Sequence, residues 1–393
     1  MNTRAHQRFR SLVIVRATHV VSALRAQQFA FALNQARGAY RAVKHRLLIG
    51  GLRLGFRHRR YYIRIERACA RFDRVIGDTL FDEPSSFDRD LLAERLRRLA
   101  SEGIYIGGSS WKYEGWIGQV YTRSNYLSRG RFSRQLFEST CLKEYAQTFP
   151  TVCGDFAFYQ FPTPEFWNRL FSLAPEGFQF AFKVPEQITC KMFPSHPRYG
   201  PQAGQQNDAF LNAEMLKEMF LRPLWPHRGK TALLIFEFGT FSKRAIAAPE
   251  EFLERLDAFL AALPAQFRYA VEVRNPEFLQ PAYFASLRAR GAAHVYSAWT
   301  RMPELRRQIE LPGSETAGFL VCRALLRHGR PYEEAVARFS PYSEIRDPNP
   351  GARESLRILI ERARQERHMA FLFVNNRLEG NSPLTIMAVT EPD

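Results

Sequence analysis

Polar and charged side chains stand at the ends of short apolar segments, at positions where a protein core would continue with Val or Ile. They are Ser109, Asp155, Lys183, Glu237, Glu272, Arg274, Arg323, Asn375 and Asn376. A buried charge is costly unless it is paired or bound to a ligand. We therefore interpret these residues as the components of one polar site.

Three cations of this set, Lys183, Arg274 and Arg323, are suited to an anionic or phosphorylated ligand. Glu272 could hold Arg274 in place or exchange a proton with a substrate. We predict a metal-independent enzyme or binding protein. The catalytic candidates are Glu272, Lys183 and Asp155. Two other interpretations stay open: an internal ion-pair network that fills space, and a glycosidase that uses Glu237 and Glu272 as a carboxylate pair.

Two long segments, 109–131 and 185–206, combine aromatic and basic residues. Loops of this length are typical of lids and binding loops, and interleaved aromatics and cations suit stacked bases or sugars. A non-catalytic nucleic-acid-binding protein is therefore the alternative function. The aromatic residues could equally be packing, because large aromatics are usually buried. The predicted ligand-binding residues are Arg274, Arg323, Glu237, Ser109, Trp111, Tyr113, Trp116, Asn375 and Asn376.

Neither a metal ion nor a cofactor is predicted. Four of the nine His precede residue 65, and none of the others ends an apolar segment, whereas a zinc-dependent nuclease needs several His and carboxylates that converge. The five Cys are scattered without a CxxC pair, and no His is placed beside Cys153 or Cys190. These thiols are predicted to be buried and inert.

Alternating strands and helices must position the polar site. The predicted strands are 104–108, 151–158, 178–184, 231–238, 268–274, 292–297, 317–323 and 369–375, and the clearest helices between them are 163–173, 208–221, 249–263, 280–290 and 353–367. Eight strands with helical crossovers over about 270 residues predict an α/β fold, a closed (β/α)₈ TIM-type barrel. An open doubly wound sheet is the rival, but no Gly-rich fingerprint opens a helix after the first strand.

The predicted strands alternate with a period of two. In 178–184, Phe and Val alternate with Gln179, Ala181 and Lys183. We expect the large apolar residues to face the helices, and the small or polar ones to face the barrel interior. An additional helix begins near Asp88, with an apolar stripe of Leu and Gly103 just beyond its end.

The net charge of +17 belongs to one end of the chain. Residues 1–65 hold fourteen Lys and Arg and no acidic residue, and residues 66–393 hold 42 basic and 39 acidic residues. We divide the chain into a basic N-terminal helical extension, 1–80, and a barrel, 81–393. The extension could be partly disordered, a lipid- or nucleic-acid-binding arm, a transit peptide, or translated upstream sequence; Met192 is the next Met after Met1.

A cytoplasmic location is predicted from the scattered cysteines, which fit a reducing compartment. The longest apolar stretch, 12–33, is interrupted by Arg16, His19 and Arg25, so neither a transmembrane segment nor a signal peptide is expected. The expected partner is a small anionic or phosphorylated ligand, with nucleic acid as the alternative. The pattern does not specify an oligomeric state.

Several segments resemble the domain-of-unknown-function-72 (DUF72, YecE-like) family. They are 107–113 (GGSSWKY) with Trp116, 151–159 with Pro162, 180–183 (FAFK) with Ile188 and Thr189, 271–274 (VEVR), and 373–376 (FVNN). The resemblance covers about 104–385 and implies a TIM-type barrel without an established reaction. Comparison of the family with endonuclease-IV-like barrels, and its suspected nucleic-acid binding, are treated as analogy.

The sequence departs from the family pattern at several positions. Cys153 replaces the usual acidic residue of the second strand, Asp155 replaces a neighbouring Asn, and Cys190 replaces a His. The Asp that usually follows the sixth strand is missing at 297–299, which read Ser-Ala-Trp. If those family positions carry chemistry, the resemblance implies that the chemistry here is altered or lost.

Overall fold

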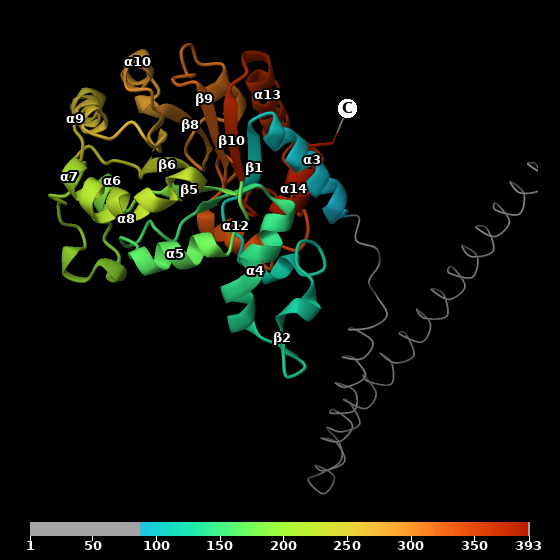
Figure 1. Cartoon of the computed structure of the whole chain (residues 1–393). Coiled ribbons are helices and arrows are strands. Elements are labelled where there is room, and N and C mark those ends of the chain that lie inside the picture. Colours follow the sequence, from blue (N-terminus) through green and yellow to red (C-terminus); the bar gives the residue numbers. More distant parts are fainter. Residues whose placement is uncertain (1–86, 392–393) are drawn as a thin grey trace, which may run out of the picture. The chain divides into compact units, whose positions relative to one another are not determined.

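The computed structural model describes residues 87–391, which contain a closed barrel of eight parallel strands (Figure 1). Around the ring, the strands follow one another as β1, β10, β9, β8, β7, β6, β5 and β4, so consecutive barrel strands are neighbours. Their bounds are β1 (Ile104–Gly108), β4 (Thr151–Gly154), β5 (Gln179–Lys183), β6 (Thr231–Phe238), β7 (Tyr269–Val273), β8 (Ala293–Ala298), β9 (Phe319–Ala324) and β10 (Met369–Val374). The predicted TIM-type barrel is confirmed.

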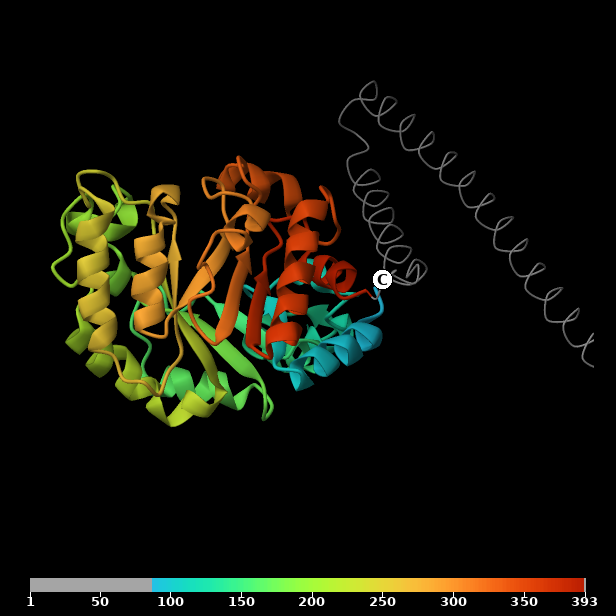
Figure 2. The ribbon, with the colours of Figure 1, turned by 90° about the horizontal axis from the view of Figure 1, so that it is seen from above.

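Helices form an outer layer around the strands (Figure 2). They are α3 (Arg89–Ser101), α4 (Arg134–Thr148), α5 (Pro164–Ser172), α6 (Glu186–Thr189), α7 (Ala213–Leu216), α8 (Arg222–Leu224), α9 (Pro249–Ala261), α10 (Pro281–Ala289), α11 (Leu305–Ile309), α12 (Tyr332–Phe339), α13 (Pro350–Glu366) and α14 (Ser382–Val389). A short hairpin, β2 (Leu127–Ser128) and β3 (Arg131–Phe132), lies outside the barrel sheet. Among residues 87–391, no helix has the length and apolar character needed to cross a membrane.

The two faces of each strand separate as the alternation predicts. Phe180 and Phe182 of β5 belong to the outer core that packs against the helices. Ala181 belongs to a second apolar cluster, made of inward-facing residues that include Ala270 and Phe371. Because side chains alternate along a strand, Lys183 lies on the interior side together with Ala181.

Two predicted elements differ from the structure. The second barrel strand ends at Gly154 and not at residue 158, because the chain turns there and the Phe158 N–H donates to the Asp155 carbonyl at 3.0 Å. A Cβ at Gly154 would lie 2.0 Å from an atom of the Phe156 ring, so any larger residue here would displace this ring. The predicted helix 208–221 is α7 followed by a wider turn and then α8, which begins just before Pro223.

The ring is joined least extensively between β1 and β4. These strands share one paired position, Gly108 with Val152, whereas β1 and β10 share five. Beside that position, the Gly108 N–H donates to the Tyr145 hydroxyl at 2.7 Å, and this hydroxyl donates to the Thr151 carbonyl at 3.0 Å. A side chain of α4 therefore completes the contact that the two backbones do not make directly.

The helix that precedes the barrel begins as predicted. Asp88 caps α3 by accepting a hydrogen bond from the Leu91 N–H at 2.9 Å. Gly103, just after the helix, has φ +86°, a conformation that glycine adopts without strain. The predicted N-terminal extension and its boundary near residue 80 lie outside the described residues.

Candidate functional site

The centre of the barrel interior at its C-terminal end holds one arginine between two glutamates. Arg323, at the end of β9, donates through NH1 to both Glu237 of β6 and Glu272 of β7. All three side chains are buried, and Arg323 is 2% exposed. The Ser297 hydroxyl of β8 donates to Glu272 Oε1 at 2.8 Å. Four neighbouring strands therefore contribute to one hydrogen-bonded group.

Two further cations contact the same carboxylates from the side of the barrel mouth. Lys183 Nζ lies 3.1 Å from Glu237 Oε2, and Arg274 NH2 lies 2.9 Å from the same oxygen. Arg274 Nε is 3.5 Å from Glu272 Oε1. Asp155 completes the group, with Oδ1 3.4 Å from Lys183 Nζ. The structure brings together Lys183, Glu272 and Arg274 within the barrel, on the interior face that the alternation predicts.

The charges of this cluster balance: three cations face three carboxylates. Burial by itself would raise the pKa of Glu237, but Arg274, Lys183 and Arg323 reverse this and hold the pKa well below its usual range. Glu237 is therefore a permanent anion that organises three cations. We name these six residues, Asp155, Lys183, Glu237, Glu272, Arg274 and Arg323, the mouth cluster.

Members of the mouth cluster differ in their access to solvent. The Glu272 side chain is 0% exposed, so a ligand at the surface does not contact it. The Asp155 side chain is 45% exposed and that of Arg274 is 14% exposed. Two buried atoms of the cluster, Arg323 Nε and Asp155 Oδ1, have no hydrogen-bond partner among the described residues. Arg323 Nε thus has no hydrogen bond inside the cluster, and Asp155 Oδ1 has only ion-pair contacts, with Lys183 at 3.4 Å and Arg323 NH2 at 3.7 Å.

The remaining predicted residues are two hydrogen-bonded pairs, Asn375 with Ser109 and Trp116 with Asn376, and two further aromatic residues, Trp111 and Tyr113. Asn375 donates to the Ser109 hydroxyl at 2.5 Å, and the Trp116 indole N–H donates to Asn376 at 3.3 Å. Both pairs join the segment after β1 to the segment after β10. Trp116 is buried against other aromatic rings, and Trp111 is also buried, whereas Tyr113 is half-buried. The Asn376 side-chain oxygen thus accepts from Trp116, whereas Asn376 Nδ2 is buried without a hydrogen-bond partner among the described residues.

A further cation, Arg377, follows Asn376 directly at the same end of the barrel. Its guanidinium carbon lies 4.6 Å from the centre of the Tyr332 ring, and it has no carboxylate partner among residues 87–391. The pKa of Tyr113 is raised to about 12 by burial; Arg377 lowers it and Asp155 raises it. Tyr113 therefore lies within electrostatic reach of both the mouth cluster and Arg377.

Sequence reasoning did not identify Arg377. The available signal was its place in the run Asn375-Asn376-Arg377, just beyond the last strand. In TIM-type barrels, the loops that follow the strands contribute residues to the C-terminal face just as the strand ends do.

Two cations of the mouth cluster and one nearby arginine lie over aromatic rings. Lys183 Nζ lies 3.6 Å from the centre of the Phe158 ring, and the Arg274 guanidinium carbon lies 3.7 Å from the Trp299 ring. Arg198 of the segment 185–206 lies 4.8 Å from the exposed ring of Tyr159. Trp299 belongs to the stretch 297–299, where the family usually has an Asp and this chain has none. Its ring lies against the Arg274 guanidinium.

Neither cysteine near the mouth offers a reactive thiolate. Burial raises the pKa of Cys153 to about 12, although Arg323 opposes the shift, and burial raises the pKa of Cys190 to about 11. A metal-compatible group does occur among the described residues, but away from the mouth cluster: Glu315, Glu366 and His368. His368 and Glu315 flank the starts of β10 and β9, and His368 Nδ1 already lies 2.7 Å from Glu315.

Part of the chain is similar to curated proteins from Escherichia coli. The UPF0759 protein YecE of Escherichia coli K12 is 31% identical over 175 residues, which are 44% of this chain and 50% of that protein. The protein of the same name from Escherichia coli O157:H7 gives the same values. The chain thus spans about half the length of the curated relatives that it matches.

Two solved structures are similar at low identity. A DUF72 family protein from Thermotoga maritima is 18% identical, with 73% of this chain and 97% of that chain covered and a TM-score of 0.48. A DUF72 family protein from Enterococcus faecalis is 17% identical, with 74% and 96% covered and a TM-score of 0.47. The family model described as "Protein of unknown function DUF72" matches residues 105–391. This match covers most of the chain, which therefore belongs to the DUF72 family.

Proposed function

We propose that the protein binds a small anionic ligand of the phosphate class at the C-terminal mouth of the barrel, beside the mouth cluster. One observation carries the proposal. Arg377 is a cation at the mouth without a carboxylate partner among residues 87–391, and it stacks on Tyr332. Every cation of the mouth cluster, by contrast, already contacts a carboxylate. A guanidinium that contacts Tyr332 and Tyr342 but no carboxylate of the described residues is suited to an incoming anion.

The groups around Arg377 support the same proposal. Arg274 is partly exposed and is fixed by Glu237 and by the Trp299 ring, so its orientation is set before a ligand arrives. Tyr113 can donate its phenolic hydroxyl, because its pKa of about 12 keeps it protonated at neutral pH. In this arrangement Glu272, which has no exposed surface, positions Arg274 and Arg323, and half-exposed Asp155 is the candidate acid or base.

The experiment is a thermal melt of the full chain with inorganic phosphate and with glycerol 3-phosphate, with glycerol as the uncharged reference. A ligand at ten times its Kd stabilises the folded state by about 1.4 kcal/mol, which raises Tm by a few degrees. We expect this rise in the wild type and its loss in Arg377→Gln. Arg97→Gln is the matched control, since Arg97 is exposed on α3 and contacts only its own helix.

Equal stabilisation of Arg377→Gln and the wild type would contradict the proposal. The proposal would also be contradicted if neither phosphate raised Tm at about 50 mM, a concentration far above the Kd expected of a specific site. A rise that glycerol reproduces would show that the charge is not recognised.

Single-stranded nucleic acid is the second candidate, and one observation favours it. Tyr159 is 60% exposed, and Arg198 stacks on its ring at the rim of the mouth. Exposed aromatic rings beside cations are the surface on which successive bases stack. The residues after the extension nevertheless carry a net charge near +3, which is a weak electrostatic footprint for a polyanion.

A further inference from the structure

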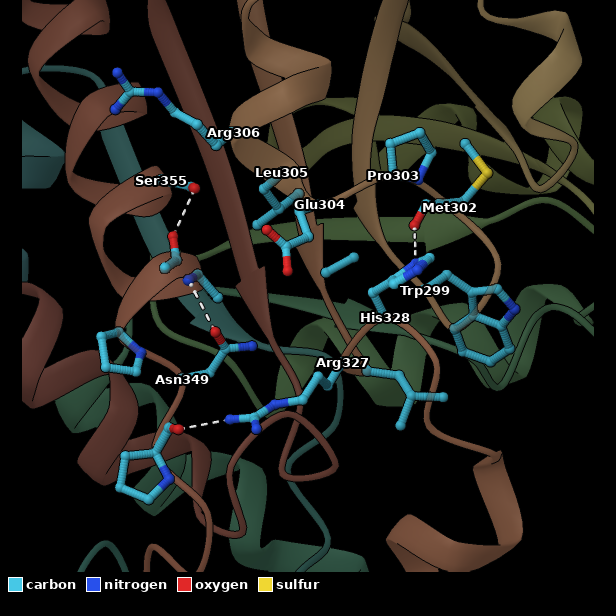
Figure 3. A pocket seen from close by; sticks show the side chains of 16 residues that line it. Trp299, Met302, Pro303, Glu304, Leu305, Arg306, Arg327, His328, Asn349 and Ser355 are labelled. Carbon is cyan, nitrogen blue, oxygen red and sulfur yellow. Dashed lines mark hydrogen bonds between the residues drawn. The ribbon is translucent and has the colours of Figure 1, made fainter.

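A separate cavity of about 280 Å³ opens beside the mouth, between the end of β8, α11, the segment after β9 and the first turn of α13 (Figure 3). Trp299 contributes to its wall and also stacks on Arg274 of the mouth cluster. The cavity contains none of the six residues of the mouth cluster, and Arg377 is not among its lining residues. It is therefore a distinct place on the same face of the barrel.

One side of the cavity carries a free negative charge. The carboxylate of Glu304, just before α11, points into the cavity (Figure 3) and has no hydrogen bond or ion pair with any residue of 87–391. Arg306, two residues later, does not neutralise it. Its side chain points away from the cavity, and its Nε lies 2.5 Å from Glu310 Oε1.

The opposite side carries an excess of positive charge. Arg327 NH2 donates to the Pro348 and Asp347 carbonyls, at 2.5 and 3.4 Å, and its NH1 lies 3.3 Å from Asp347 Oδ1. The same carboxylate also contacts Arg330, and Arg338 at 3.5 Å. Glu334 lies 3.6 Å from Arg330 and adds a second acidic group. Two carboxylates among three guanidinium groups leave a net positive charge on the Arg327 side of the cavity.

The first turn of α13 adds to this positive side. Asn349 caps the helix by accepting from the Ala352 N–H at 3.2 Å, but the Gly351 N–H has no hydrogen-bond partner among the described residues. Both residues line the cavity. The positive end of a helix of 17 residues therefore faces the same space as Arg327.

Apolar side chains and one histidine complete the lining. The apolar residues are Trp299, Met302, Pro303, Leu305 and Leu326. His328 Nδ1 lies 2.7 Å from the Met302 carbonyl oxygen, which can only accept, so Nδ1 carries the hydrogen. In the neutral ring, Nε2 is then a free acceptor and, like Glu304, is suited to an ammonium group.

We propose that this cavity binds a free α-amino acid with an apolar side chain. Glu304 and His328 Nε2 accept from its ammonium group, Arg327 and the first turn of α13 hold its carboxylate, and the apolar wall contacts its side chain. The opposite charges on the two sides disfavour a simple anion or a simple amine. A volume near the lower end of small-molecule pockets suits a molecule of this size.

The test compares L-leucine with two analogues by isothermal titration calorimetry on the full chain. The analogues are 4-methylpentanoate, which lacks the amine, and 3-methylbutylamine, which lacks the carboxylate. We expect leucine to bind at least about tenfold more tightly than either, because each analogue loses one charge-assisted contact. Glu304→Gln should reduce leucine binding to the level of 4-methylpentanoate.

Two controls separate this site from others. Glu361→Gln removes the charge of an exposed carboxylate on α13 that is paired with Arg364 and does not line the cavity, and it should leave leucine binding unchanged. Arg377→Gln should also leave it unchanged, so failure of the mouth site and failure of this site are distinguishable.

Three results would overturn the proposal. The first is no binding of leucine, methionine or phenylalanine at about 10 mM. The second is unchanged leucine binding in Glu304→Gln. The third is binding of 3-methylbutylamine as tight as that of leucine, which would make the cavity a site for amines.

Discussion

Individual buried carboxylates in this protein are satisfied to different degrees. Glu379 is 0% exposed and accepts from Arg353 Nε at 2.9 Å and from the Thr385 hydroxyl at 2.7 Å. The Asn349 N–H also donates to it. Glu237 of the mouth cluster instead contacts three cations at once, and the cluster leaves Arg323 Nε without a partner. Glu379 is thus fully satisfied within the fold, whereas the mouth cluster keeps one buried donor without a partner.

This contrast predicts the effect of Lys183→Met. After the change Glu237 keeps Arg274 and Arg323, and half-exposed Asp155 keeps Arg323 NH2 at 3.7 Å, so neither carboxylate loses all its partners. We expect a loss of unfolding free energy well below the roughly 3–5 kcal/mol that follows removal of one partner of a buried pair. Binding of phosphate at the mouth should weaken in the same variant. Urea unfolding measures the first effect and the thermal melt with phosphate measures the second.

Arg353→Met is the matched control, because it removes the guanidinium partner of fully buried Glu379. It should show the larger loss of stability and no change in phosphate binding. If Lys183→Met is destabilised as much as Arg353→Met, the mouth cluster is a structural network and the proposed function loses its support.

At the scale of strands and helices, the sequence predicted which residues form each strand and which face turns inward. It did so because alternation is a local property of the chain. It misplaced the end of the second barrel strand, since the turn at Gly154 depends on the packing of the Phe156 ring. It also did not predict that Arg323 bridges Glu237 and Glu272, because such contacts depend on the register between strands that are far apart in sequence.

A histidine in β8 makes the stability of this strand sensitive to pH. His294 is buried, and burial lowers its pKa from 6.5 to about 3. The unfolded chain therefore binds a proton below pH 6.5 that the folded chain does not bind until about pH 3. Stability contributed by the neutral ring is present above pH 6.5 and is lost as the pH falls from 6.5 to 3.

His294→Phe should remove this contribution to acid sensitivity. The substitution removes the 3.2 Å contact between His294 Nδ1 and the Tyr283 hydroxyl. It also removes Nε2, which is buried without a hydrogen-bond partner among the described residues. We expect a smaller loss of unfolding free energy between pH 6.5 and pH 4 than in the wild type, by a few kcal/mol. Urea unfolding at several pH values measures it. Parallel curves for the two proteins would show that other groups cause the acid sensitivity.

At the scale of the whole molecule, the strongly basic residues and the residues of the family match occupy separate parts of the chain. The family match begins at residue 105, and the acid-free stretch ends at residue 65. Residues 66–393 are nearly balanced in charge. The strong basicity of the chain is therefore a property of its N-terminal part, and conclusions about nucleic acid drawn from total charge do not transfer to the barrel.

We expect that residues 1–80 can be removed without unfolding the barrel. The elements of residues 87–391 close the ring by themselves, and one continuous core packs the helices against the strands. Calorimetric melts of the full chain and of a fragment 81–393 should give similar Tm values. A fragment that is insoluble, or that melts much earlier, would show that the extension supports the fold.

The same two proteins test the nucleic-acid alternative. Binding to single-stranded and duplex DNA is measured as a function of salt concentration. A steep salt dependence that survives removal of the extension would favour the barrel as the binding surface, and one that disappears with the extension would assign it to the basic residues.

The difference in the extent of strand pairing on the two sides of β1 also determines when this protein can fold during its synthesis. β1 pairs with β10 over five positions but with β4 at one, where the Tyr145 hydroxyl completes the contact. On the ribosome, β1 emerges among the first strands, and the strand that supplies most of its hydrogen bonds emerges last. Until about residue 374 has left the exit tunnel, one edge of β1 therefore stays open. A chain that stops before β10 leaves an unpaired, apolar strand edge, which is the kind of surface that chaperones and proteases bind.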